Sequence, residues 1–222
     1  ASENADVVAN SDIILLSIPL SRYKNIDADL LKGKLVIDAM NYWWETDGIR
    51  EEVLDPSTTS SEQVQTYFKD AKIVKAFNHM GYHNLQEEAR LKGDPKRKAL
   101  FVTGNDPDAV ATVAAFVDHM GFDTVVHNNL ADGIMTEPGS PLFGASLRYA
   151  ELKDIIDHFD QTEFGKEVAA QTHKWWNWYK GKAYGLLKAE ASCLFATSVN
   201  QKLSVKINHA MLRANFSKSS YL

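Results

Sequence analysis

The chain has 222 residues, and 45% of them are hydrophobic, enough to form the core of one medium domain with an appendage or of two small domains. Its 24 basic and 29 acidic residues give a net charge of −5, so no basic excess is available to attract nucleic acid. The single cysteine, Cys193, excludes an internal disulfide and indicates a reducing compartment, so we expect a cytoplasmic protein. No apolar run approaches membrane-spanning length, so we expect no membrane partner.

Five short apolar runs predict β-strands, at residues 12–18, 34–39, 72–77, 99–103 and 123–126. Each run is nearly continuous in Ile, Leu, Val, Ala or Phe and does not alternate with polar residues. This is the pattern of parallel strands that are buried on both faces. No further strand-like run follows residue 145. We therefore expect a parallel sheet built from these five strands.

Segments of helical character separate the strands, at residues 22–31, 62–69, 82–92 and 107–120. The last is the clearest, because Asp106 is a good N-cap, Pro107 stands at the first helical position and Gly121 follows the end. Thr59 and Glu62 have the spacing of a capping box at the start of the second segment. Alternating strands and helices predict right-handed crossovers, and so an α/β fold with a doubly wound sheet.

Several segments, taken in order, carry a family resemblance. They are residues 17–19 (SIP), 33–41 (GKLVIDAMN), 74–81 (VKAFNHMG), 99–106 (ALFVTGND) and 137–144 (EPGSPLFG). In this order they resemble the NADPH-dependent coenzyme F420 reductase family, and the related oxidoreductase domain of membrane ferric reductases shares the same landmarks. The resemblance covers residues 1–148. It implies a Rossmann-like domain that binds NADP and transfers a hydride to a deazaflavin or flavin acceptor.

One element of such a domain is absent from the sequence. A glycine-rich turn normally opens it, because only glycine lets the backbone approach the pyrophosphate at a helix N-terminus. The chain contains no Gly-x-Gly, and its first glycine is Gly33. We therefore expect a Rossmann-like sheet that is truncated at its N-terminus and lacks its first strands, with an open edge on strand 12–18. This chain by itself should bind NADP poorly.

The sequence changes character near residue 148. Residues 147–159 and 164–190 are helical in composition, and a strongly aromatic run lies at 174–180. We expect a partial NAD(P)-binding domain over 1–148 and a helical C-terminal extension over 149–222. The aromatic run should bury a helix against the domain or against a second subunit through Trp175, Trp176 and Trp178, so we expect a homodimer.

Nine residues at the ends of the first three predicted strands are candidates for binding the cofactor: Ser17, Ile18, Pro19, Leu20, Tyr23, Asn41, Ala76, Phe77 and Asn78. Open α/β sheets bind ligands at the carboxyl ends of their strands. The resemblance implies that residues 18–20 and Tyr23 line the cofactor. The carboxamides of Asn41 and Asn78 each offer a donor and an acceptor. They can therefore orient a nicotinamide amide or a phosphate edge, or else cap the turns in which they stand.

Other features leave alternatives open. Trp43 and Trp44 could stack on a flat acceptor or simply cover the sheet. By resemblance the loop 137–141 borders the acceptor, and it could equally be a linker into the C-terminal helices. His79, His83 and Glu87 are spaced i, i+4 and i+8, which could suit a metal, but a cofactor-facing loop followed by a solvated helix fits this sequence better.

No Ser/His/Asp arrangement and no carboxylate pair for acid–base chemistry emerges from the sequence. This fits hydride transfer, in which the cofactor carries the chemistry and the protein holds two rings in contact. We therefore assign no catalytic acid or base and no metal ligand. The acceptor could be a deazaflavin, a flavin, a metal chelate or a small imine. The alternative function is a non-catalytic nucleotide-sensing or protein-interaction module with a Rossmann-like sheet.

Overall fold

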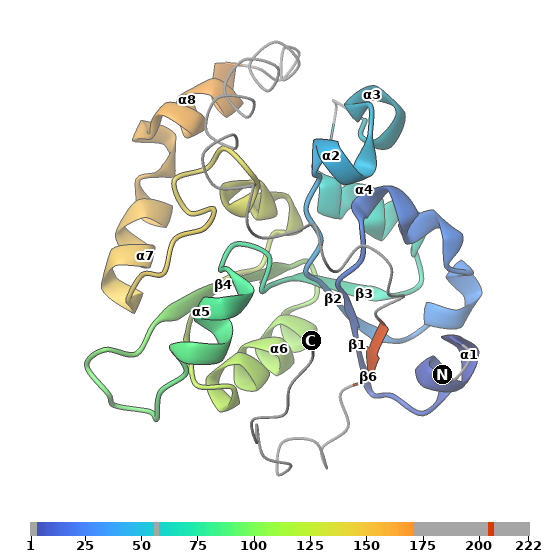
Figure 1. Cartoon of the computed structure of the whole chain (residues 1–222), viewed down its shortest axis with the longest axis horizontal. Helices are drawn as coiled ribbons and strands as arrows, with labels where there is room; N and C mark the ends of the chain where they lie inside the picture. Colours follow the sequence, from blue (N-terminus) through green and yellow to red (C-terminus); the bar gives the residue numbers. More distant parts are fainter. Residues whose placement is uncertain (1–3, 56–57, 171–203, 207–222) are drawn as a thin grey trace.

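The computed structural model describes residues 4–55, 58–170 and 204–206, which form an α/β structure around one central sheet (Figure 1). The sheet has six strands in the order β5-β4-β3-β2-β1-β6. They are β1 (Ile13–Leu16), β2 (Leu35–Asp38), β3 (Lys72–Lys75), β4 (Ala99–Gly104), β5 (Asp123–His127) and β6 (Ser204–Lys206). All five strands expected from the apolar runs are present, so the α/β prediction is confirmed.

The sheet is parallel except at two pairings. β1, β2 and β3 run parallel in register, with Ile14 beside Val36 and Val36 beside Ile73, and β4 and β5 also run parallel. β3 and β4 are antiparallel, with Val74 opposite Gly104, so the expectation that all five strands are parallel is wrong at this pairing. The only helix between these two strands is α5 (Tyr82–Glu87), whose six residues span about 9 Å. It is too short to return the chain to the other end of the sheet.

The edge of β1 is paired, which corrects two expectations. β6 lies antiparallel to β1, with Ser204 opposite Leu16 and Lys206 opposite Ile14. A further strand therefore follows residue 145, and in the described structure the edge of β1 is not open. A three-residue strand carries no apolar run, so the sequence pattern could not reveal it. At this edge, β6 gives hydrogen-bond partners to the backbone N–H and C=O groups of β1.

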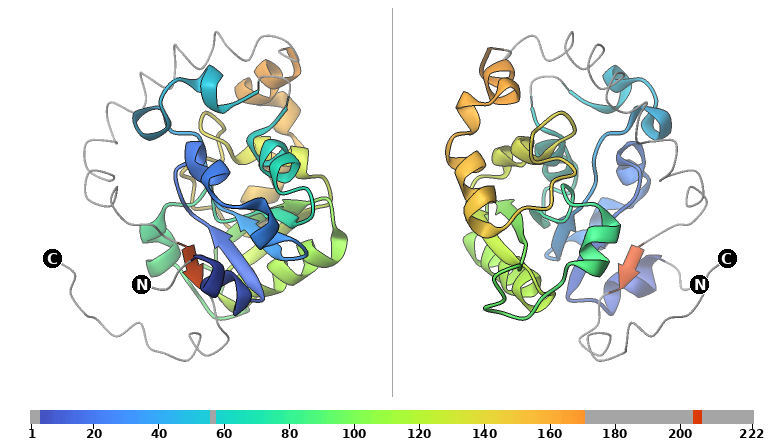
Figure 2. Two further views of the ribbon diagram at one scale, coloured as in Figure 1. Left: turned by 90° about the vertical axis from the view of Figure 1, so that its right-hand side faces the viewer. Right: turned by 60° about the vertical axis from the view of Figure 1, so that its left-hand side comes forward.

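Helices cover both faces of the sheet, as Figure 2 shows. On one face α6 (Pro107–His119) packs against the sheet through Val110 and Val113, which share a core cluster with Ile37 and Val74. The other face is covered over β1 to β3 by α1 (Asn4–Ala9), η1 (Leu20–Asn25), η2 (Ala28–Leu31) and α4 (Ser60–Tyr67). The sheet is therefore doubly wound, as the alternation of strands and helices predicted.

Helix α7 (Tyr149–Asp157) completes the second face over β4 and β5. Its Leu152 and Ile156 lie in one core cluster with Phe101 and Val125. The division at residue 148 thus falls directly before a helix that shares the core of the sheet, and it stays a prediction. The remaining helices are α2 (Trp44–Asp47), α3 (Arg50–Val53), η3 (Leu130–Thr136), η4 (Phe159–Gln161) and α8 (Glu163–Ala170).

The predicted helix ends agree best where caps are present. α6 begins at Pro107 after the Asp106 cap and is followed by Gly121, which has φ 103°. Segment 22–31 forms two 3-10 helices where one helix was expected, and α5 ends at Glu87, before the expected end. Most of segment 164–190, with its tryptophans, lies outside the described residues. None of the described helices is long and apolar enough to cross a membrane.

Helix α4 begins with the predicted capping box. The Thr59 side chain accepts from the Glu62 N–H, and the Glu62 side chain accepts from the Thr59 N–H. We predict that Thr59→Ala lowers the free energy of unfolding by about 1 kcal/mol, because the first turn loses a backbone hydrogen-bond partner. Urea unfolding followed by circular dichroism measures this. The matched control is Thr66→Ala on the same helix, where the hydroxyl only bonds back to the Glu62 carbonyl; an equal loss there would contradict the capping role.

Candidate functional site

The carboxyl ends of three neighbouring parallel strands meet at one edge of the sheet. β1 continues into Ser17-Ile18-Pro19, β2 into Asn41, and β3 into Asn78. The ladder hydrogen bonds extend beyond the strands, because the Ala39 N–H donates to the Leu16 carbonyl at 3.0 Å. We call this edge the carboxyl edge. The structure thus brings the predicted residues of all three strands to the position where open α/β sheets bind ligands.

The two asparagines at this edge contact each other. Asn41 Nδ2 donates to the Asn78 carbonyl at 2.7 Å, and Asn78 Nδ2 donates to Asn41 Oδ1 at 3.2 Å. Asn78 is buried and also bonds Thr136, whose hydroxyl and carbonyl oxygens lie 3.0 and 3.1 Å from Nδ2. Asn41 is only half-buried. The pair therefore joins β2 to β3 and to η3, and Asn41 presents the accessible carboxamide.

Phe77 sets the direction of the chain between β3 and Asn78. It is the only described non-glycine residue with a positive φ, at 65°. For an L-residue this left-handed conformation costs about 1–2 kcal/mol. The side chain is held edge-on against Phe116 of α6, with ring centroids 5.9 Å apart. The left-handed conformation of Phe77 turns the chain so that Asn78 meets Asn41. The candidate site therefore contains a strained backbone residue.

A buried ion pair lies directly beneath the asparagines. Lys75, the last residue of β3, and Asp38, the last residue of β2, are both fully buried, with Nζ and Oδ2 3.2 Å apart. Lys75 also donates to the Met40 carbonyl, and Asp38 Oδ1 accepts from the Met40 N–H at 3.0 Å. The pair therefore holds both sides of the Met40 peptide, one residue before Asn41. Sequence reasoning missed it, although a charged residue ends each of two otherwise apolar runs.

The N-terminus of α4 adds three further polar groups to this region. Ser61 Oγ donates to Asp38 Oδ2 at 2.8 Å. Ser60 donates from both its N–H and its hydroxyl to Glu137 Oε1, at 3.3 and 2.6 Å. Glu137 is buried, so its carboxylate is satisfied by the positive end of the helix as well as by the hydroxyl. Segment 137–141 is thus fixed to the carboxyl edge and is not a free linker.

The predicted residues differ in how much surface they offer. Ser17 is exposed and Ile18 and Pro19 are half-buried, so this turn is accessible. Leu20 and Tyr23 are at most 2% exposed and belong to the core over β1 and β2, where Tyr23 packs edge-on against Tyr67. Burial raises the pKa of Tyr23, with smaller contributions from Tyr67 and Asp38. Leu20, Tyr23 and Ala76 are therefore core residues in this structure and offer almost no surface to a ligand.

An aromatic pair follows Asn41 closely in the chain. Trp43 stacks on Phe143 with ring centroids 6.2 Å apart and planes 30° apart. The Phe143 loop is anchored next to the site, because the N–H of Gly144 donates to the His79 carbonyl at 2.7 Å. Trp44, the first residue of α2, is 49% exposed. Of the two tryptophans, Trp43 is therefore the one seen to contact the segment 137–144.

His79 is a buried structural residue. Its Nε2 accepts from the Phe101 N–H at 3.0 Å, and burial lowers its pKa to about 4, against a smaller opposing effect of the Leu142 backbone. His83 lies at the exposed start of α5, where its ring contacts Tyr82. The structure therefore does not bring these two histidines together. Within the described residues no group of three or more His, Cys, Asp or Glu side chains could hold a metal ion.

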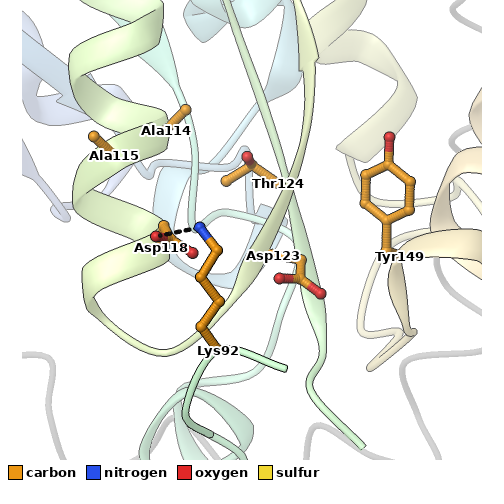
Figure 3. Close-up of a pocket in the computed structure, with 7 residues that line it drawn as sticks. All are labelled: Lys92, Ala114, Ala115, Asp118, Asp123, Thr124 and Tyr149. Atoms are coloured by element: carbon orange, nitrogen blue, oxygen red, sulfur yellow. Dashed lines mark hydrogen bonds and ion pairs between the residues drawn. The ribbon is translucent and has the colours of Figure 1, made fainter. Parts of the chain in front are cut away.

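A surface hollow lies at the opposite edge of the sheet from β1, and Figure 3 shows it in close-up. It is lined by Lys92, Ala114, Ala115, Asp118, Asp123, Thr124 and Tyr149. None of these is among the nine predicted site residues. The hollow runs along β5 between α6 and α7 and so belongs to a different part of the molecule from the carboxyl edge.

The chain is similar to known proteins in sequence and in fold. Residues 1–42 match the model of the family described as NADP oxidoreductase, coenzyme F420-dependent. The F420-dependent NADP reductase of Methanocaldococcus jannaschii is 27% identical over 155 residues, which are 66% of this chain and 67% of that protein. The crystal structure of a hypothetical protein, SMa0349 from Sinorhizobium meliloti, superposes with a TM-score of 0.51 at 28% identity, over 65% of this chain and 70% of the other.

Together, the doubly wound sheet and the polar groups at its carboxyl edge define a Rossmann-like α/β protein. Within that class, the chain is related to the coenzyme F420-dependent NADP oxidoreductases, as its segments at residues 17–19, 33–41 and 74–81 indicated.

The contribution of the buried ion pair to stability can be tested by removing one of its two charges. We predict that Lys75→Met lowers the free energy of unfolding by about 3–5 kcal/mol, because Asp38 then remains buried without its counter-charge. Urea unfolding measures the loss. The double variant Lys75→Met/Asp38→Asn should be more stable than Lys75→Met alone, since it removes the uncompensated charge and keeps an oxygen for the Met40 N–H. If the double variant is less stable than Lys75→Met, the stability lost in Lys75→Met arises from packing and not from an unpaired charge.

The low pKa of His79 predicts a dependence of stability on pH. The folded state holds this histidine neutral down to about pH 4, whereas the unfolded chain takes up the proton near pH 6.5. Stability from this residue is therefore complete above pH 6.5 and is lost as the pH falls from 6.5 to 4, by about 3 kcal/mol in total. His79→Gln keeps an acceptor for the Phe101 N–H and does not titrate. The stability advantage of the unsubstituted protein over His79→Gln should shrink as the pH falls from 6.5 to 4. A difference in unfolding free energy that stays constant over this range would refute the low pKa of His79.

Proposed function

We propose that this chain is the nicotinamide-side part of an NADP-dependent oxidoreductase that transfers a hydride between NADP(H) and a deazaflavin acceptor, with a flavin as the alternative acceptor. Support comes from the relation to the coenzyme F420-dependent NADP oxidoreductases. The observation that carries the proposal is the convergence of Ser17-Ile18-Pro19, Asn41 and Asn78 at the ends of three adjacent parallel strands.

The donor set at this edge fits a nicotinamide. Asn41 gives one amide hydrogen to the Asn78 carbonyl and accepts one hydrogen bond at Oδ1. The carboxamide therefore retains a second N–H and a second lone pair, the complement of the amide of a nicotinamide. NADP(H), when bound, supplies or takes up the hydride. Pro19 has no N–H, so its backbone can lie against a ring without an unsatisfied donor.

The residues around the carboxyl edge prepare the site and take no part in proton transfer. Lys75 and Asp38 fix the Met40 peptide and hence the position of Asn41, and Thr136 fixes Asn78. Ile18 and Phe77 provide apolar surface that excludes water from two stacked rings. No acid or base is assigned. The sequence contains no Gly-x-Gly, so the proposal assigns no contact to the pyrophosphate or to the 2′-phosphate. The single cysteine favours a cytoplasmic protein.

The test is the oxidation of NADPH, followed by absorbance, with a deazaflavin or a flavin as acceptor. The protein used is the natural one, with any sequence that precedes Ala1. We predict that Asn41→Ala raises KM for NADPH about tenfold, because one or two hydrogen bonds to the cofactor are lost. Asn10→Ala is the control, since Asn10 is an exposed asparagine whose side chain bonds only within the α1 region.

The outcomes separate the site from the function. Turnover with an unchanged KM in Asn41→Ala would remove Asn41 from the proposed site but leave the activity in place. NADP binding by calorimetry without turnover with either acceptor would favour the alternative, a nucleotide-sensing module. A protein that neither binds NADP nor oxidises NADPH with either acceptor would refute the proposed function.

A further inference from the structure

Asp47 is a buried carboxylate outside the set of residues assigned to the proposed site. It is the last residue of α2 and is only 8% exposed. The C-terminal end of a helix disfavours a negative charge, and burial disfavours it further. A carboxylate at this position therefore requires strong hydrogen bonds from the groups around it.

Both carboxylate oxygens of Asp47 accept hydrogen bonds from backbone N–H groups. Oδ2 accepts from Trp43 at 2.7 Å, across the α2 turn. Oδ1 accepts from Ser21 of η1 at 2.8 Å, and Ser21 stands 26 residues earlier in the chain. Hydrogen bonds to a charged acceptor are about twice as strong as those between neutral groups. Asp47 thus fastens η1 to the start of α2.

The turn that carries Asp47 is held in place by its neighbours. Gly48 follows with φ 80°, a conformation that favours glycine, and its N–H donates to the Trp44 carbonyl at 3.0 Å. The hydroxyl of the buried Tyr42 donates to the Gly48 carbonyl at 2.6 Å. The carboxylate therefore has a fixed position from which to hold Ser21.

The two segments that Asp47 joins carry the accessible residues of the carboxyl edge. Ser21 closely follows the exposed or half-buried turn of residues 17–19, which continues from β1. Trp43 closely follows the half-buried Asn41, which continues from β2. Asp47 therefore links the turn after β1 to the turn after β2, as the buried ion pair links β2 to β3.

The separation of these two turns decides how a nicotinamide can fit between them. In the proposed function, Asn41 holds the amide of the ring and the backbone of Pro19 lies against the ring. Turns that are already fixed at the right separation do not have to be ordered when the ligand binds. If they moved freely, binding would have to order them, and the affinity would fall.

We propose that Asp47 is a positioning residue that holds the turn of residues 17–21 at a fixed separation from Asn41 and so preforms the nicotinamide-binding surface. It acts through the N–H groups of Ser21 and Trp43 and need not touch the cofactor. The role in binding rests on the proposed function, whereas the link between the two turns can be measured without any cofactor.

Hydrogen exchange in the absence of cofactor tests the link. Asp47→Ala removes both acceptor oxygens, so the amides of Ser21 and Trp43 should each exchange at least about tenfold faster, measured by NMR. If Asp47→Ala does not fold, Asp47→Asn keeps the shape of the side chain but only one acceptor oxygen, so at least one of the two amides should show this effect. The amide of Ala39, which donates to the Leu16 carbonyl, is the internal reference. Unchanged exchange at both amides would overturn the proposal.

The kinetic test separates positioning from stability. In the natural protein, with any sequence that precedes Ala1, Asp47→Asn should raise KM for NADPH and the calorimetric Kd of NADP at least about fivefold, because binding must then order the turn. A loss of stability alone would lower the active fraction, and hence the apparent kcat, at an unchanged KM. Asp106→Ala is the matched control, because Asp106 also accepts a backbone N–H, that of Ala109, but at the start of α6.

The outcomes distinguish this inference from the proposed function. Faster exchange together with a raised KM and Kd, and normal KM and Kd in Asp106→Ala, supports the positioning role. An unchanged KM in an active Asp47→Asn, or an equal rise in Asp106→Ala, contradicts it. If the unsubstituted protein neither binds NADP nor oxidises NADPH, the proposed function fails, and the exchange of the Ser21 amide still decides whether Asp47 holds the turn.

Discussion

The buried pair of Lys75 and Asp38 is the interaction on which the carboxyl edge depends. It joins the last residues of β3 and β2 and holds both sides of the Met40 peptide. Two charges with no exposed surface are tolerated only when each finds several partners, because desolvation otherwise exceeds their attraction. Here the partners come from the β2 turn and from Ser61 of α4. The requirement to satisfy these charges therefore fixes the relative positions of two strand ends and one helix.

The same constraint extends outward to the accessible residues. Asn41 follows Met40 directly, and its carboxamide meets Asn78, which the positive φ of Phe77 turns toward it. Thr136 and Glu137 then fasten the following loop to the edge. Strain, a buried ion pair and a buried carboxylate are thus concentrated within one region, as is common where a protein must hold a ligand in a fixed orientation.

Much of the fold could be predicted from the sequence, for identifiable reasons. The five apolar runs became strands, and two-sided burial accounts for the central runs, whereas β5 buries only Val125 and leaves Val126 exposed. The caps at Thr59 and Asp106 placed two helix starts. At the carboxyl edge, Ser17, Asn41 and Asn78 were recognisable as polar or turn residues at strand ends, and the structure brings Asn41 and Asn78 into contact. Their role in binding a cofactor stays a prediction. Lys75, Asp38 and Thr136 were missed, because their partners are 37 to 58 residues distant in sequence.

What the sequence by itself determined is the presence of strands β1 to β5, the starts of helices α4 and α6, and the relation to the coenzyme F420-dependent NADP oxidoreductases, since all of these depend on local patterns in fixed order. Only the tertiary structure decided the direction of β4, the pairing of β1 with β6 and the burial of Leu20 and Tyr23. Aliphatic periodicity records how deeply a strand is buried but not which way it runs or what lies beside it. Those choices follow from connection length, unsatisfied backbone groups and buried charge, which act between residues far apart in the chain.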